Sequence, residues 1–360
     1  MAGETPAAGC DVWMHGFPVP GRAGKLARHA EDLGFDGLLL ADSQNLVGDP
    51  FTELGVAAGV TSRLGLGTGV VNLVTRHPAV IAAAIASVQV ESRGRAVLGV
   101  GRGDSSLAQL GLAAPSTARL GELVQQVRGY LNGAEVRAGA GTSRIGWIGE
   151  TGMPAVPVEV AATGPRTIGL AATAADRLML TVGAEPERVA RAISIARRAR
   201  AQAGLDPAGL RIGAYLNIAC HQDTSVACGL VRGSVAVFAR FSAMAGGAPP
   251  GFSGSDASVI AGLSASYDEA RHGLSAAAHA AALDDAFVAR FAVAGPPAEC
   301  IARLRQLIGL GLDRIVFVPG SRDSDPELLA STNELFAWEV LPALQEPRPG
   351  VSPAARAGAR

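Results

Sequence analysis

Short apolar runs alternate with longer amphipathic stretches along almost the whole chain. Eight runs have the length of a strand and are apolar nearly throughout, which is typical of parallel strands covered on both faces. They occupy residues 11–17, 35–42, 64–71, 95–101, 156–162, 176–182, 211–219 and 313–319. Helical patterns fill the intervals, at 22–33, 50–62, 78–92, 117–131, 165–175, 186–203, 224–310 and 326–345. This order predicts an α/β fold, a closed (β/α)8 TIM barrel, with a doubly wound open sheet as the alternative.

Two segments interrupt the alternation. A Gly-rich stretch at 132–156 follows the fourth helix, and a Gly/Pro/Ser stretch at 243–256 follows the seventh strand. Long insertions in such barrels commonly form lids and specificity loops, so we expect both to influence substrate choice. The remainder forms a single domain over 11–345, with disordered ends at 1–10 and 346–360.

Composition and charge limit the possible functions. Hydrophobic residues make up 48% of the 360 positions, and the formal net charge is −1, so there is no general reason to expect nucleic acid or a membrane as partner. The N-terminus lacks the basic region and apolar core of a signal peptide, which favours a cytoplasmic location. Because Lys25 is the only lysine, a Schiff-base mechanism is disfavoured.

The four cysteines and six histidines show neither CxxC pairs nor an HExxH pattern. We therefore expect no dedicated metal site, and cysteines that act as small buried hydrophobes in a reducing compartment.

Polar residues close many of the apolar runs. In a barrel of this kind the active site lies at the C-terminal ends of the strands. The residues placed there are His15 and Phe17, Asp42 to Gln44, Asn72 to His77, Arg102 to Asp104, Thr163 to Arg166, Thr181, and Gly320 to Arg322. Polar groups at so many strand ends favour a lined pocket over core packing alone.

Two Gly-containing strings carry further information. In "VLGVGRGD" (97–104) the glycine spacing does not fit the dinucleotide-binding fingerprint G-x-G-x-x-G, but it would let a flat ring approach the backbone. In "ATGPRTIGLA" (162–171) Pro165 suits the first turn of a helix, whose free amides would form an anion site with Arg166. An ordinary capped helix explains the second string equally well.

Four strings together resemble the bacterial luciferase-like superfamily, and most of all its deazaflavin-dependent branch of methylenetetrahydromethanopterin reductases. They are "LGTGVVNLVTRHPAV", "LGVGRGD", "VEVAATGPRTIGLAATAADRLMLTV" and "FAVAGPPAECIARLRQLIGLGLDRIVFVPG", in the family's order and spacing. The resemblance covers roughly 11–345 and implies a barrel, usually dimeric, that holds coenzyme F420 or FMN at the strand C-termini.

The resemblance also implies which residues hold the cofactor. A non-prolyl cis peptide would lie at Gly69–Val70, behind the central ring, with Asn72 near the polar edge of the ring. Gly101 and Gly103 would give the ring room. The side chain and phosphate of the cofactor would be held by Ala162, Thr163, Gly164, Arg166, Thr181 and Val182.

The chain departs from the family at the end of the second strand. Many relatives have an Asp-His pair there, whereas this chain has Asp42 followed by Ser43 and Gln44, so the usual proton donor is missing. His15 is the best substitute, although a structural role is equally compatible with its position. Asp104 is a second candidate, and Asp42 could instead hydrogen-bond the ring edge.

His77 and Arg76 stand beside these residues but are expected to act structurally. His77 precedes Pro78, which places it at the start of a helix, so a capping role is expected, with Arg76 as a neighbouring hydrogen-bond donor.

The first functional hypothesis is F420-dependent hydride transfer to or from a small organic substrate. An FMNH2-dependent monooxygenase is the alternative, and a non-catalytic flavin-binding relative is the second. F420 would need an open basic groove for its anionic tail, for which Arg22, Arg166 and Arg322 are candidates. A non-redox isomerase or aldolase is disfavoured by the lack of a lysine base and of a metal cluster.

Overall fold

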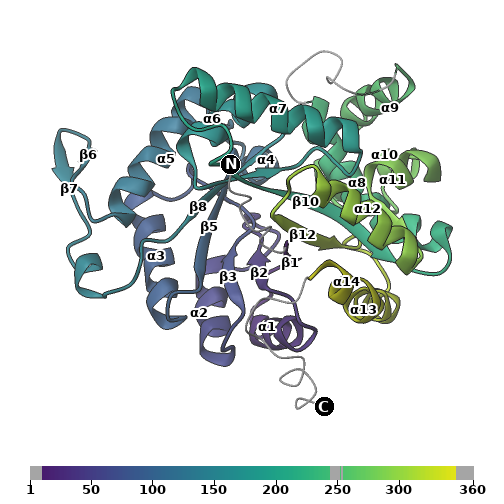
Figure 1. The fold of residues 1–360 in the computed structure, drawn as a ribbon, viewed down its shortest axis with the longest axis horizontal. Coiled ribbons are helices and arrows are strands. Elements are labelled where there is room, and N and C mark those ends of the chain that lie inside the picture. The colour runs from purple at the N-terminus through teal and green to yellow at the C-terminus, as the bar shows by residue number, and fades with distance from the viewer. Residues whose placement is uncertain (1–9, 244–251, 253, 346–360) are drawn as a thin grey trace, which may run out of the picture.

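Parallel strands close into a barrel with helices on its outer side (Figure 1). The structure is a computed structural model that describes residues 10–243, 252 and 254–345. The predicted disordered ends, except Cys10, and part of the insertion at 243–256 lie outside the described residues. The barrel strands are β1 (Asp11–Gly16), β2 (Gly37–Leu40), β3 (Gly65–Thr68) with β4 (Val71–Asn72), β5 (Ala96–Gly101), β8 (Val158–Ala162), β9 (Arg177–Leu180), β10 (Arg211–Cys220) and β12 (Arg314–Pro319).

The order of the strands confirms the (β/α)8 prediction. β10 pairs with both β9 and β12, and β12 pairs with β1, all in parallel, so the sheet has no open edge between its first and last barrel strands. The open-sheet alternative is therefore wrong.

Helices follow the strands at the predicted positions. They are α1 (Ala23–Asp32), α2 (Pro50–Val60), α3 (Pro78–Glu91), α5 (Thr117–Leu131), α6 (Pro165–Ala174), α7 (Pro186–Gln202), α8 (Thr224–Ala243), α12 (Pro297–Gly309) and α13 (Pro326–Leu335). Many begin with proline, whose fixed φ suits the first helical turn and whose missing N–H is not needed there. Asp49 caps α2 by accepting from the backbone N–H of Thr52.

The predicted third strand is divided in two. β3 and β4 are separated by Gly69 and Val70, and β4 pairs with β5 beyond the break. A short helix, α4 (Asp104–Ala108), follows β5 and was not predicted, since five residues carry too little periodicity to be recognised.

The region 224–310 is not one helical stretch. It contains α8, α9 (Gly254–Ala265), η2 (Glu269–Arg271), α10 (Ala278–Ala281), α11 (Asp285–Phe291), β11 (Val293–Gly295) and α12. β11 adds a short parallel strand beside β10. Although α8 is long and apolar enough to cross a membrane, more than half of that window is buried inside the structure. Its apolar character is therefore explained by core packing against α9 to α11.

The insertion at 132–156 lies away from the expected site. It forms the hairpin of β6 (Val136–Ala138) and β7 (Gly141–Ser143) and then η1 (Ile148–Glu150), and Figure 1 shows this hairpin projecting from the body of the molecule. The segment leads from a helix into a strand, so it sits at the N-terminal end of the barrel. The expected role in substrate choice is therefore wrong for this insertion.

The inside of the barrel is filled at its N-terminal end. The indole of Trp13 occupies the space left by Gly37 and Gly65, where an added Cβ would come within 2.3 and 2.5 Å of it. Next to it, Oε1 of Glu159 accepts from Arg177 and Arg314 at 2.7 and 2.6 Å. This floor leaves the C-terminal end as the open end of the barrel.

Candidate active site

A cavity of about 680 Å³ lies at the C-terminal ends of the barrel strands. This is within the usual size of a cofactor or small-ligand site. The predicted residues that line it are His15, Asp42, Gly69, Val70, Gly101, Gly103, Ala162, Thr163, Gly164, Arg166, Thr181 and Val182. Residues nominated from six separate strand ends thus meet in one place.

The bulge between β3 and β4 forms part of the cavity wall. The peptide bond between Gly69 and Val70 is cis, as the resemblance implies. The backbone N–H of Gly69 donates to the carbonyl oxygen of Leu40 at 2.8 Å, and the Gly69 carbonyl accepts from Nε2 of His15 at 2.7 Å. The ends of β2 and β1 therefore hold Gly69 through its N–H and its carbonyl oxygen, and only the second of these groups belongs to the cis peptide.

Gly101 and Gly103 fit the bulge closely. A Cβ on Gly101 would lie 2.6 Å from Cγ2 of Val70, and a Cβ on Gly103 would lie 2.4 Å from Cβ of Asn72. Gly103 also has a φ of +81°, which favours glycine. These two glycines therefore make room for the side chains of Val70 and Asn72, besides the room that they were expected to give the cofactor ring.

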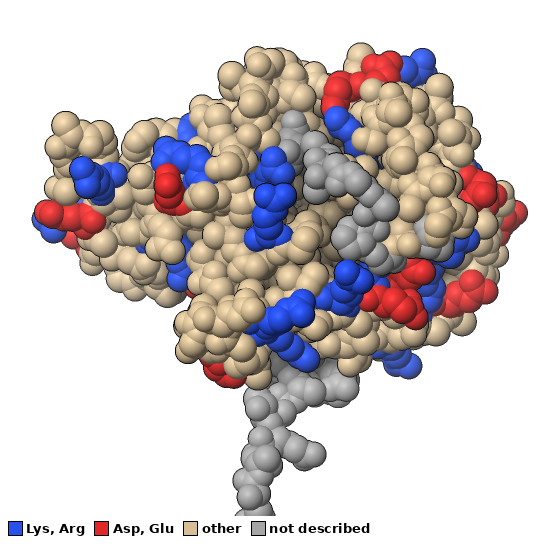
Figure 2. Space-filling view, turned by 90° about the horizontal axis from the view of Figure 1, so that it is seen from above, with Lys and Arg blue, Asp and Glu red and all other residues tan. Residues whose placement is uncertain are grey.

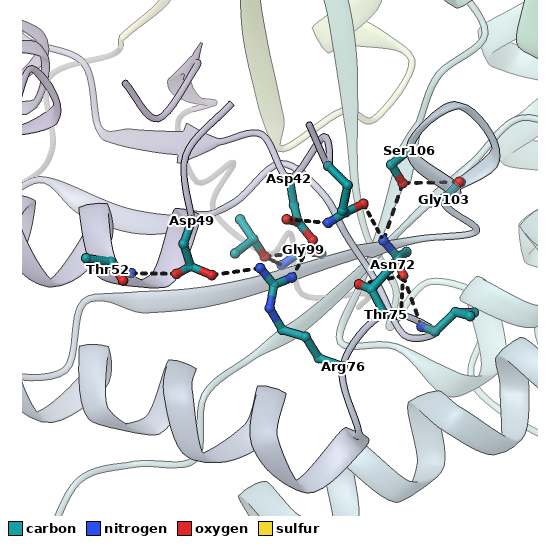
Figure 3. Close-up of polar contacts among 12 residues, drawn as sticks. Asp42, Asp49, Thr52, Asn72, Thr75, Arg76, Gly99, Gly103 and Ser106 are labelled. Carbon is teal, nitrogen blue, oxygen red and sulfur yellow. Dashed lines mark hydrogen bonds and ion pairs between the residues drawn. The ribbon is translucent and has the colours of Figure 1, made fainter. Parts of the chain in front are cut away.

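A polar network connects the end of β2 with the end of β4 (Figure 3). Oδ1 of Asp42 accepts from Gln44 at 2.8 Å, and Oδ2 accepts from Arg76 at 2.7 Å. The other arm of Arg76 donates to Asp49 at 2.7 Å. Both carboxylate oxygens of Asp42 are therefore acceptors of hydrogen bonds, and its position on the cavity wall is fixed.

Asn72 is the one cofactor-binding prediction that does not line the cavity. Its buried side chain donates to Gln44 and Ser106, while its carbonyl oxygen accepts from the backbone N–H groups of Val74 and Thr75. Figure 3 shows it between Ser106 and Thr75. Asn72 thus supports the loop after β4, whereas contact with the ring edge had been expected.

The predictions for the segment after Asn72 are confirmed. Nδ1 of His77 accepts from the backbone N–H of Ala79 at 3.2 Å and caps α3. Arg76 is the hydrogen-bond donor of the network above. The third catalytic candidate, Asp104, begins α4, but its side chain lies outside the described part of the chain.

His15 is a neutral imidazole at neutral pH. Burial lowers the pKa of its ring, and the hydrogen bond to Gly69 opposes this only in part. Next to it lies Tyr215, whose ring centroid is 6.2 Å away. The Tyr215 hydroxyl is buried and has no hydrogen-bond partner in the part of the chain that the structure describes. An unpaired hydroxyl beside the cavity is an expected contact for a bound group.

Basic side chains surround one side of the cavity, and Figure 2 shows several on the face that it views. Arg166 and Arg322 line it as expected, and Arg22 does not. Thr163 and Thr181 are joined by their hydroxyls at 2.6 Å, beside the start of α6. The start of α6 has no side-chain cap, and its amides together with the arginines favour an anionic group there.

Several lining residues were missed by the sequence analysis. They are Ser105, Ser106, Arg188, Arg191, Tyr215, Phe238, Phe241, Phe252 and His272. Tyr215 had a usable signal, because it is a large polar residue in the middle of a mostly apolar strand. The residues from α7, α8 and the following segment had none, since their approach to the barrel depends on the tertiary structure.

Known proteins resemble this chain in sequence. Residues 4–314 match the family model of luciferase-like monooxygenases. A 5,10-methylenetetrahydromethanopterin reductase of Methanolobus tindarius is 27% identical over 310 residues, which are 81% of this chain and 87% of that protein.

Solved structures share the fold. The coenzyme F420 dependent tetrahydromethanopterin reductase from Methanopyrus kandleri superposes with a TM-score of 0.73 at 22% identity, covering 94% of this chain and all of that one (100%). A monooxygenase from Streptomyces bottropensis gives a TM-score of 0.65 at 24% identity, covering 92% of this chain and 99% of that one.

Proposed function

Because this chain belongs to the luciferase-like monooxygenase family, we propose that it is an oxidoreductase that uses coenzyme F420 to transfer a hydride to or from a small organic substrate. The observation that carries the proposal is the composition of the cavity. Apart from Asn72, every residue that the resemblance assigns to the cofactor lies on its wall.

The described residues fit a ring with an anionic tail. Gly69 and Val70 offer an apolar surface with few side chains, and the buried hydroxyl of Tyr215 has no partner there among the residues that the structure describes. At the other side, Arg166 and Arg191 are exposed lining residues, and the start of α6 supplies amides for a phosphate. A basic rim that extends beyond one phosphate pocket favours F420, with its long anionic tail, over FMN.

The cofactor would supply the hydride chemistry, since a reduced deazaflavin donates a hydride from C5. The protein binds the cofactor and the substrate, orients them and excludes water from the site. Asp42 offers a fixed acceptor on the wall, and Nδ1 of the neutral His15 is a proton acceptor, because its Nε2 proton is held by Gly69. This differs from the proton-donor role expected for His15. Asp104 remains a candidate from the sequence alone.

Paired titrations of the purified protein with F420 and with FMN test the choice of cofactor. Cofactor fluorescence is followed in both, and F420 is expected to be quenched at micromolar concentrations while FMN binds more weakly. Tighter binding of FMN would favour the alternative of an FMNH2-dependent monooxygenase. Binding of neither would overturn the proposal.

We also propose that the protein is a homodimer that associates through α2 and α3. These neighbouring helices are apolar on almost all sides, and Glu91 is the one exposed charged residue on either of them. Val56 and Val80 are 50% and 56% exposed. Apolar helices with an exposed face are typical of buried interfaces.

Sedimentation of a variant carrying Val56→Glu and Val80→Glu tests the dimer. The variant is expected to sediment as a monomer, because charges in an apolar interface lose their hydration without gaining partners. Leu205→Glu, at an exposed site away from these helices, is the matched control and should sediment like the wild type. A monomeric wild type would overturn the proposal.

A further inference from the structure

A second group of polar side chains reaches the cavity from the segment between α9 and α10. His272 and Gly273 of this segment line the cavity, together with Phe238 and Phe241 of α8. These residues match none of the positions that the sequence analysis linked to the cofactor. They form a wall with aromatic surface and one imidazole.

Tyr267 fixes the proton of that imidazole. Its hydroxyl oxygen lies 2.9 Å from Nδ1 of His272. Arg240 and the backbone N–H of Gly273 act on this hydroxyl in the direction that lowers its pKa, against the larger effect of burial. Positive groups beside the oxygen favour its lone pairs on their side, so we assign the hydroxyl as the donor to Nδ1. A neutral His272 then carries its own proton on Nε2.

The surroundings keep His272 neutral at neutral pH. Burial is the largest cause that lowers its pKa, to about 4, and Arg240, Arg322 and His279 act in the same direction. Among the described residues, Glu269 is the one carboxylate within 4.0 Å of a ring nitrogen of His272, at 3.8 Å from Nδ1, and it is also paired with Arg240 at 2.5 Å.

The imidazole is held in a fixed position. Tyr267, which contacts the imidazole, is itself packed between two side chains. The centroid of its ring lies 4.2 Å from the ring centroid of His279 and 4.2 Å from the guanidinium of Arg240. Arg322 donates to the carbonyl oxygen of His272 at 2.7 Å. A donor fixed in advance loses little conformational entropy when it binds an acceptor.

Nε2 of His272 has no hydrogen-bond partner among the described residues. We propose that this N–H binds the carbonyl oxygen or imine nitrogen of an uncharged substrate, whose apolar part packs against Phe238 and Phe241. The inference rests on the proposed function and identifies the substrate class. The hydrogen bond draws electron density from the double bond and so favours hydride addition to its carbon.

Nitrogen NMR of the protein with ¹⁵N-labelled histidine tests the proton position without any cofactor. The His272 signal should show a protonated Nε2 and an unprotonated Nδ1 at pH 7, and Tyr267→Phe should shift it toward a mixture of tautomers. A proton on Nδ1 in the wild type would overturn the proposal.

Acetophenone and α-methylstyrene form a matched pair of probes, because α-methylstyrene has a methylene group where acetophenone has its carbonyl oxygen. In NMR titrations the wild type should bind acetophenone about 2- to 10-fold more tightly, which is the range for one neutral hydrogen bond. His272→Gln keeps a donor and should keep much of this preference, whereas His272→Leu should lose it.

An equal preference in the wild type and in His272→Leu would overturn the proposal, as would no preference in the wild type. The wild-type comparison stands even if a variant does not fold. F420 affinity should be unchanged in His272→Leu. Failure of F420 to bind any of these proteins would contradict the proposed function while leaving the tautomer and the probe preference measurable.

Discussion

Nε2 of His15 donates a hydrogen bond to the carbonyl oxygen of Gly69 across 2.7 Å. This contact joins the end of β1 to the bulge between β3 and β4, two elements that are far apart in the sequence. It also commits the ring proton to the backbone, since a carbonyl oxygen only accepts. His15 therefore positions the cavity wall and presents a lone pair, on Nδ1, for any proton that the reaction releases.

Acidification is expected to destabilise the protein in part through His15. Burial lowers the pKa of His15 in the folded protein, so below about pH 6.5 the unfolded chain binds a proton that the folded chain does not. The contribution of the neutral His15 to the free energy of unfolding is thus fully present above that pH and is lost as the pH falls. In urea unfolding at pH 8 and pH 5.5, His15→Gln should show a smaller decrease in the free energy of unfolding than the wild type.

His29 supplies the control for this measurement, because it is exposed on α1. His29→Gln should keep the wild-type dependence on pH. If His15→Gln also keeps it, His15 is not the buried neutral group described above.

Gly101→Ala is expected to weaken F420 binding by disturbing Val70. The new Cβ would stand 2.6 Å from Cγ2 of Val70, so the bulge must shift, and overpacking of this kind destabilises by roughly 1–3 kcal/mol. We expect at least a ~5-fold weaker F420 affinity in fluorescence titrations, the equivalent of about 1 kcal/mol.

The double variant Val70→Ala with Gly101→Ala removes both methyl groups of Val70 and should recover part of the affinity. Gly149→Ala is the matched control, since an added Cβ there meets nothing within 4 Å. Equal losses in the single and double variants would show that the contact with Val70 is not the cause.

Arg76→Gln should destabilise the fold more than the loss of an exposed ion pair. The side chain of Asp42 is 4% exposed, so without Arg76 its buried charge loses the one cationic partner that it has among the described residues. We expect a decrease of about 2–4 kcal/mol in the free energy of unfolding, measured by urea denaturation.

Asp49→Asn provides the comparison, because Asp49 is 43% exposed and asparagine still caps α2. It should cost at most about 1 kcal/mol. Adding Asp42→Asn to Arg76→Gln should restore stability, and a double variant as unstable as the single one would rule out the buried charge as the reason.

Arg191→Gln should weaken F420 binding and reduce its dependence on salt. Arg191 lies on the cavity rim, where a cation attracts the anionic tail of the cofactor. A loss of about 3- to 10-fold is expected at low salt, and a smaller one at 0.5 M NaCl. Arg198 is exposed on the same helix, α7, but does not line the cavity, so Arg198→Gln should have no effect. Equal effects of the two variants would argue against a tail-binding rim.

Much of the site could be predicted from the sequence, because strand ends are local features. The apolar run before Asp42 and the string around Gly101 each reveal where a strand stops, and the barrel brings such ends together. The lining residues of α7, α8 and the segment that follows α8 could not be placed in this way. His272 reaches the cavity through contacts with Tyr267 and Arg322, and no sequence period encodes those contacts.

The role of Asn72 shows a second limit. Its place at the end of a strand suggested contact with a ligand. Instead, its side-chain oxygen Oδ1 accepts hydrogen bonds from the backbone N–H groups of Val74 and Thr75. A polar residue at a strand end can accept hydrogen bonds from the backbone of the loop that follows it, or it can contact a ligand. The sequence alone does not distinguish these two roles.

Calorimetric titration of the wild-type protein with F420 tests the central claim most directly. The account predicts one site per chain with a Kd of about 1 µM or tighter, a binding free energy near −8 kcal/mol, and loss of affinity in Gly101→Ala. An absence of binding heat and of fluorescence quenching up to about 100 µM F420 would contradict it.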